Sequence, residues 1–140
     1  MREILFRGKD LQNQNGWLIG FFYKSDINKR ERTSGKATLI FTPDCDTFIY
    51  VPQYHNSWMV HADTVGQYTG LKDKNSKRIF EGDILKVPNW DCYGKVQYAV
   101  PECRFEIEMF DNGYCVLMHD FASEVEVIGN IHDNPELLEE

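Results

Sequence analysis

Short stretches of apolar or alternating apolar and polar side chains dominate the first half of the chain, a pattern typical of β-strands. These stretches are residues 3–7, 17–23, 37–41 and 47–51. Asn15-Gly16 precedes the aromatic stretch 17–23 and favours the positive φ values of a tight hairpin turn. Residues 24–36 hold five Lys and Arg against two acidic residues, so we expect an exposed loop there.

Strand signals are clearer in the second half. Ile79-Phe80 leads through Glu81-Gly82-Asp83 into a strand over residues 84–87, and Pro88 ends that strand because proline cannot donate to a central ladder. The further predicted strands are residues 94–100, 104–110 and 124–131. In the last of them we expect Val125 and Val127 to face inward and Gly129 to form a bulge or bend.

The sequence predicts a hairpin over residues 104–118 that turns at Asn112-Gly113. A two-residue loop there would pair Asp111 with Tyr114 and Ile107 with Met118. The apolar residues of the two strands would then share the core face: Phe105, Ile107, Met109, Tyr114, Val116 and Met118. Arg104, Glu106 and Glu108 would point the other way.

The chain is predicted to be mainly β, with a short helix near its end. Asn134-Pro135-Glu136 is a helix start, and only one or two turns can follow it. Closely spaced strands with tight turns fit a small SH3-like β-barrel, because closure removes exposed strand edges. We therefore expect an N-terminal β-rich region over residues 1–63 and an SH3-like barrel with the terminal helix over residues 64–140.

Composition and charge narrow the class of protein. Hydrophobic residues make up 42% and charged residues 26% of the 140 residues, which excludes wholesale disorder. The N-terminal residues are too charged for a signal peptide, so we expect a soluble, cytoplasmic protein. The net charge is −7, and residues 119–140 carry seven acidic residues and no Lys or Arg. This acidic end disfavours nonspecific binding of nucleic acid.

Candidate chemistry is sparse. Cys45, Cys92, Cys103 and Cys115 lack the spacing of a metal site, and in a reducing compartment we expect buried, free thiols. The neighbouring His and Asp residues are His61 with Asp63, His119 with Asp120 and His132 with Asp133. Neighbours on a strand point to opposite faces, so we expect capping, turn or surface roles for these pairs and no metal or cofactor site. Without a nucleophile motif, the sequence favours a protein that is not an enzyme and has no catalytic residues.

Three blocks resemble the YopX family of phage and prophage proteins. They are MREILFRG at residues 1–8, TVGQYTGLKDKNSKRIFEGDI at residues 64–84 and EVIGNIHDNPELL at residues 126–138. The resemblance implies an SH3-like barrel and a phage or prophage origin in a bacterial host, but no biochemical activity. Where the family has Asn-Gly, this chain has Asn75-Ser76, so a residue other than glycine must adopt or avoid positive φ.

Two readings of function compete. The turn from Lys72 to Arg78 carries Lys72, Lys74, Lys77 and Arg78 between Tyr68 and Phe80, and such a turn could bind single-stranded nucleic acid. Lys-rich turns are also ordinary surface features. Asp83 is either a polar anchor in a groove or, as we expect, a carboxylate that accepts backbone N–H groups.

The favoured reading is a non-enzymatic accessory protein that binds an unknown phage or host protein, or itself. It rests on the number of large aromatic residues: Trp17, Phe21, Phe22, Tyr23, Tyr50, Tyr54, Trp58, Trp90 and Tyr93. Most of these rings should be in the core, and those that are not would form an exposed patch of the kind that marks protein contacts.

Overall fold

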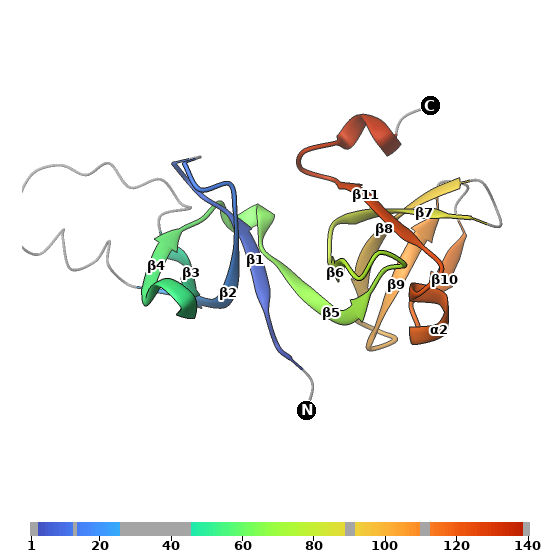
Figure 1. The fold of residues 1–140 in the computed structure, drawn as a ribbon, viewed down its shortest axis with the longest axis horizontal. Helices are drawn as coiled ribbons and strands as arrows, with labels where there is room; N and C mark the ends of the chain where they lie inside the picture. Colours follow the sequence, from blue (N-terminus) through green and yellow to red (C-terminus); the bar gives the residue numbers. More distant parts are fainter. Residues whose placement is uncertain (1–2, 13, 26–45, 89–91, 110–112, 139–140) are drawn as a thin grey trace, which may run out of the picture. The chain divides into compact units, whose positions relative to one another are not determined.

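The computed structural model describes residues 3–12, 14–25, 46–88, 92–109 and 113–138 (Figure 1). The described chain is mainly β and forms antiparallel sheets, which confirms the prediction of a mainly β protein. The predicted strand 37–41 and most of the predicted loop 24–36 lie outside the described residues. None of the helices in the described parts of the chain is long and apolar enough to cross a membrane.

The chain divides into two compact units, Ile4–Gln67 and Tyr68–Glu140 with Met1–Glu3. We call them the N-terminal unit and the C-terminal unit. The division falls inside strand β5, Gly66–Lys72. Gly66 and Gln67 pair with β1 in the N-terminal unit, whereas Tyr68 and Lys72 pair with β6 in the C-terminal unit.

In the N-terminal unit the sheet has the order β4-β3-β2-β1-β5. The elements before β5 are β1 Phe6–Lys9, β2 Trp17–Lys24, β3 Thr47–Val51, the 3₁₀ turn η2 Pro52–Tyr54, β4 Asn56–Met59 and the 3₁₀ turn η3 Ala62–Thr64. Its core consists of Leu18, Ile49, Val51 and Val60, with Phe6, Trp58 and Val65 packed against them. The predicted strands over residues 17–23 and 47–51 are confirmed as β2 and β3.

The β1–β2 connection is longer than the predicted tight turn. Lys9 pairs with Trp17, so residues 10–16 form the loop, and Gly16 adopts a φ of +65° at its end. Asp10 is buried and holds this loop: its carboxylate accepts the backbone N–H of Gln12 at 3.1 Å and that of Asn15 at 3.0 Å. A buried carboxylate can organise a longer loop because it satisfies several backbone donors at once.

In the C-terminal unit a five-stranded sheet has the order β10-β9-β8-β7-β11. The elements after β5 are β6 Arg78–Phe80, β7 Asp83–Val87, β8 Cys92–Ala99, β9 Arg104–Met109, β10 Tyr114–Val116, the short helix α2 His119–Ala122, β11 Glu126–Asn130 and the 3₁₀ turn η4 Pro135–Leu138. Among the described residues β10 pairs only with β9 and β11 only with β7. Strand pairing among the described residues therefore does not close a barrel. The predicted SH3-like barrel is thus unconfirmed.

The core of this unit lies on one face of the five-stranded sheet. Its buried members include Leu85, Val96 and Ile107, and Val127 packs against them. The bulge predicted near Gly129 is confirmed, because the β11–β7 register shifts between Val127 and Gly129. A short terminal helix is also confirmed, as the 3₁₀ turn η4, whereas α2 was not predicted.

The register predicted for the β9–β10 hairpin is wrong. Tyr114 pairs with Glu108 instead of Asp111, and Cys115 pairs with Ile107. Residues 110–112 lie outside the described residues, and the N–H of Met109 donates to the carbonyl of Gly113 at 2.8 Å. A shift by an odd number of residues exchanges the two faces of a strand.

The face exchange changes which β10 side chains are buried. Tyr114 and Met118, predicted to be in the core, are each 60% exposed. Cys115 and Leu117 pack in or against the core. Glu106 points away from the core, as predicted, but it is buried. Gln97 donates to its carboxylate at 3.0 Å, and the side chain of Arg104 lies 3.5 Å from that carboxylate.

A buried carboxylate organises the β5–β6 turn. Asp73 accepts the backbone N–H groups of Asn75 and Lys77, both at 2.9 Å, on one oxygen. Its other oxygen accepts the N–H of Val127 from β11, also at 2.9 Å. The turn is thus joined to a strand more than fifty residues away. Ser76, at its tip, adopts the left-handed conformation with a φ of 64°.

We expect Asp73→Ala to lower the free energy of unfolding by about 3 kcal/mol, because three backbone donors lose a charged acceptor. Asp73→Asn should cost less, since one amide oxygen remains. Chemical denaturation of each variant measures the effect, with Asp120→Ala, at a fully exposed carboxylate, as the matched control. Unfolding of Asp73→Ala at the wild-type midpoint would contradict the role assigned to this carboxylate.

Ser76→Gly should stabilise the protein by about 0.5–1 kcal/mol, because glycine adopts positive φ without a steric penalty. Ser76→Ala keeps a β-carbon in the same conformation and should bring no gain. Thermal unfolding of the two variants tests this, and an equal effect of glycine and alanine would show that backbone strain is not the cause.

Candidate functional site

Aromatic side chains form a continuous surface on the N-terminal sheet, on the side opposite its core. Side chains alternate between the two faces of a strand, and paired residues share a face. Phe21 pairs with Tyr50 and Tyr23 with Phe48, whereas Leu18 and Ile49 point into the core. We call the outward surface the aromatic face, which comprises Ile19, Phe21, Tyr23, Phe48, Tyr50 and Met59.

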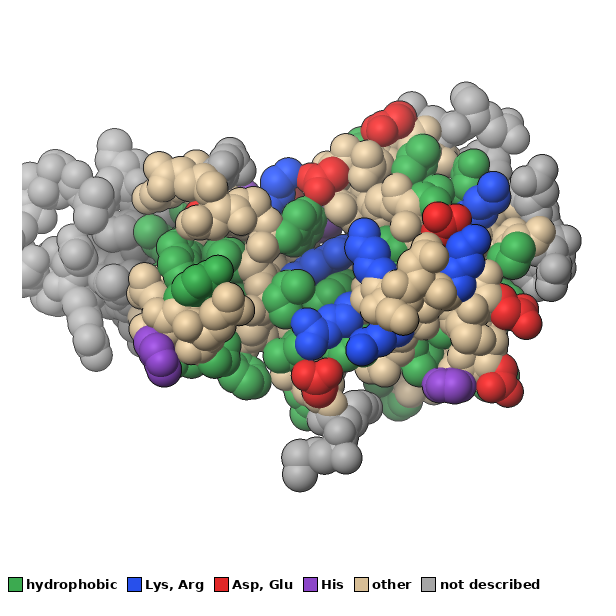
Figure 2. Space-filling model, in the orientation of Figure 1, with side chains coloured by type: hydrophobic (Ala, Val, Ile, Leu, Met, Phe, Trp, Pro, Cys, Tyr) green, Lys and Arg blue, Asp and Glu red, His purple; other side chains and the backbone are tan. Residues whose placement is uncertain are grey.

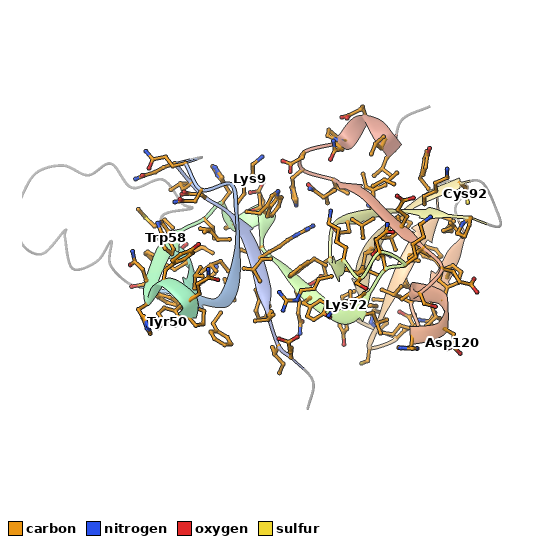
Figure 3. The ribbon with its side chains drawn as sticks, in the orientation of Figure 1. Lys9, Tyr50, Trp58, Lys72, Cys92 and Asp120 are labelled. Carbon is orange, nitrogen blue, oxygen red and sulfur yellow. The ribbon has the colours of Figure 1, made fainter. Side chains whose placement is uncertain are left out.

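The aromatic face is solvent-accessible. Phe21 is 50% exposed, Tyr23 41% and Ile19 38%. The rings of Tyr23 and Phe48 stack with their centroids 5.2 Å apart and their planes 11° from parallel. Figure 2 shows hydrophobic side chains at the surface of the N-terminal unit, and Figure 3 shows Tyr50 and Trp58 on opposite sides of their strands. The Tyr23 ring is thus packed against Phe48 within the chain itself.

The close approach of β2 and β3 fixes the ring pairs. A β-carbon built on Gly20 would overlap the carbonyl oxygen of Tyr50. Any other residue at position 20 would therefore push the two strands apart. Phe21 follows Gly20 in the chain and pairs with Tyr50 across the strands. The close approach of Gly20 to the Tyr50 carbonyl therefore also sets the spacing of the aromatic pairs.

The β4 edge of this sheet is partly blocked as a binding surface. The N–H of Ser57 donates to the side chain of Asn56 at 2.9 Å, and the carbonyl of Met59 accepts the N–H of Leu11 at 2.9 Å. Occupied backbone groups hinder the addition of another strand. The side-chain surface is consequently the better candidate for contact.

Two cations accompany the rings. Arg7 pairs with Ile19 and Lys9 with Trp17, so both lie on the same side of the sheet as the aromatic face. The guanidinium of Arg7 lies 4.6 Å from the centre of the Trp17 ring, and Arg7 is only 8% exposed. Strands β1 to β4 contain no acidic residue. This side of the sheet is therefore apolar and weakly basic.

The basic turn, the site of the alternative nucleic-acid interpretation, has its two flanking rings buried. Tyr68 and Phe80 are buried, and the guanidinium of Arg78 lies 5.6 Å from the Tyr68 ring centre. Arg78 also lies 3.6 Å from Glu3, and Lys74 lies 3.4 Å from Glu126. Lys72 and Lys77 are exposed. Bases cannot stack on buried rings, so the turn offers only part of the surface that single-stranded binding requires.

The His and Asp pairs are not assembled into a larger site. His119 and Asp120 approach to 3.4 Å on the open surface, and Asp133 accepts the side-chain amide of Asn130 at 3.1 Å within a turn. No group of three His, Cys, Asp or Glu residues in the described ranges has the geometry of a metal site. The prediction for Asp83 is confirmed: it is buried and accepts the N–H of Phe80 at 2.8 Å.

Three of the four cysteines are described, and no disulfide links any two of these three. Cys92 and Cys115 are half-buried, and burial raises the pKa of the Cys115 thiol above its usual value. Cys103 is exposed, which corrects the prediction that it is buried, because it lies in the turn between β8 and β9 with a φ of 53°. Cys45 lies outside the described residues.

Sequence reasoning counted Phe21, Tyr23 and Tyr50 among the aromatics but could not place them on one surface. It missed Ile19, Phe48 and Met59 as members of that surface. The available signal was the stretch 17–23, which is apolar at odd and even positions alike apart from Gly20. Such a strand has more apolar surface than one core face can bury.

Comparisons with known proteins support the resemblance found in the sequence. The crystal structure of protein EF1440 from Enterococcus faecalis is similar, with a TM-score of 0.55, 25% identity, and coverage of 99% of this chain and 100% of that chain. No curated protein matches. The model of the YopX protein family matches residues 5–139. The chain therefore belongs to the YopX family.

Proposed function

We propose that this chain is a non-enzymatic phage or prophage accessory protein of the bacterial cytoplasm, and that it acts by binding another protein. The observation that carries the proposal is the exposed aromatic face, centred on Phe21 and Tyr23. Contiguous exposed apolar surface is a common mark of protein contacts. Aromatic side chains are enriched at interfaces because they contribute large contact area with little loss of rotamer freedom.

The size of the exposed surface fits a transient contact. If a large side chain offers about 200 Å², the three most exposed members of the face leave roughly 250 Å² in water. Burying that area contributes about 6 kcal/mol before the costs of association, which are of similar size. Further contacts outside the face would be needed for tight binding.

The C-terminal unit fits the role of a scaffold in this proposal. Its buried apolar residues form one core, and Tyr98, Val100, Tyr114 and Met118 lie exposed outside it. Its sheet also carries paired charges such as Lys95 with Glu108 at 3.3 Å. We further propose that this unit is related to small SH3-like barrels, because five antiparallel strands and a short helix contribute to a single core.

Phe21→Ser should reduce capture of a protein partner at least tenfold, as expected for a residue at the centre of a contact. The experiment is affinity purification of the tagged full chain from host cells during prophage induction, with nuclease treatment and a high-salt wash. Bands that survive both treatments are identified and bound again as purified proteins.

Tyr114→Ser is the matched control, because Tyr114 is an exposed ring on the C-terminal unit. Circular dichroism checks that both variants are folded. Equal binding of the purified partner by wild type and Phe21→Ser would show that the aromatic face is not the contact surface.

A further inference from the structure

We propose that the aromatic face receives arginine side chains from a basic partner protein, whose guanidinium groups stack on the exposed rings. This inference rests on the proposed function and specifies the chemistry of the partner. Phe21 and Tyr23 are the rings with the most free surface on the face, and Tyr50 and Phe48 stand beside them as cross-strand partners.

The same side of the sheet already holds one guanidinium in this way. Arg7 lies over the Trp17 ring at 4.6 Å, within the range in which a cation is attracted by the ring face. Arg78 and Tyr68 repeat the arrangement at 5.6 Å in the C-terminal unit. A planar guanidinium stacks on an aromatic ring and is more weakly hydrated than the ammonium of lysine. The exposed rings therefore favour arginine.

The net charge of the whole chain favours a basic partner at long range, whereas Arg7 and Lys9 make the side of the sheet that carries the rings weakly basic. The whole chain carries a net charge of −7, so it attracts basic proteins at long range. The N-terminal unit, residues 4–67, holds seven Lys and Arg against six Asp and Glu, so the excess negative charge lies in the rest of the chain. Strands β1 to β4 have no carboxylate to form an ion pair. On these strands the rings are the groups that would hold an arriving cation.

A second copy of the chain fits the face less well. Two copies would repel each other through their equal charges of −7. The roughly 250 Å² left in water by Ile19, Phe21 and Tyr23 is also well below the ~800 Å² that each partner contributes to a stable interface.

Nucleic acid also fits the face less well. Arg7, which lies beside the rings, is 8% exposed and already stacked on Trp17. Phosphate binding depends on several accessible cations, and the net negative charge of the chain opposes it. A protein with accessible arginines meets neither difficulty.

The test uses the full chain and a labelled peptide of six alternating Gly-Arg pairs, with matched Gly-Lys and Gly-Glu peptides, in fluorescence anisotropy titrations. We expect the arginine peptide to bind at least threefold more tightly than the lysine peptide, and the glutamate peptide not to bind. Phe21→Ser and Tyr23→Ser should each weaken arginine-peptide binding about fivefold. Tyr23→Phe should bind as wild type does, as should the control Tyr114→Ser.

Equal binding of arginine and lysine peptides, unaffected by Phe21→Ser, would overturn the inference, since general attraction to acidic surface would then explain it. Phe21-dependent binding of an oligo-dT strand in place of the peptide would overturn it in favour of nucleic acid. A Phe21-dependent dimer in sedimentation would overturn it in favour of a second copy. If a purified partner binds through Phe21 but the arginine peptide does not, this inference fails while the proposed function stands.

Discussion

The sheet of the N-terminal unit has two faces, and the single core of the unit covers only one of them. Leu18 and Ile49 point to the core side, and close packing there leaves the opposite side chains of the same strands outside. Those side chains are rings, and water surrounds about half of Phe21. Exposed apolar surface of this kind reduces solubility unless a partner covers it. The shortage of a second core is therefore the physical basis of the proposed contact surface.

The C-terminal unit handles its polar groups differently. Asp73 and Asp83 are buried carboxylates. Asp73 accepts backbone N–H groups in the β5–β6 turn, and Asp83 accepts the N–H of Phe80. Buried charges of this type are favourable only when donors surround them. Each carboxylate therefore fixes the turn in which it lies. In the described part of this unit, the buried carboxylates Asp73 and Asp83 thus stabilise the fold.

The two units also differ in charge, and the difference matters for recognition. The C-terminal unit is strongly acidic and attracts a basic partner at long range. The N-terminal unit is nearly neutral and offers its exposed rings for contact at short range. Contact through rings without carboxylates depends little on salt, whereas attraction by net charge is screened. The salt dependence of association and dissociation would separate the two contributions for a purified partner.

The sequence alone determined the strands and several of the local polar roles. Apolar stretches and turn residues predicted β2, β3 and β7, the bulge near Gly129 and the function of Asp83, because these depend on neighbours along the chain. Three blocks of sequence indicated the family. Only the tertiary structure decided the β9–β10 register, since loops of two and three residues both fit the same sequence and give opposite faces. It also decided which side of β2 is buried, because both sides are apolar and the choice depends on Ile49 and Val60, which are distant in the chain.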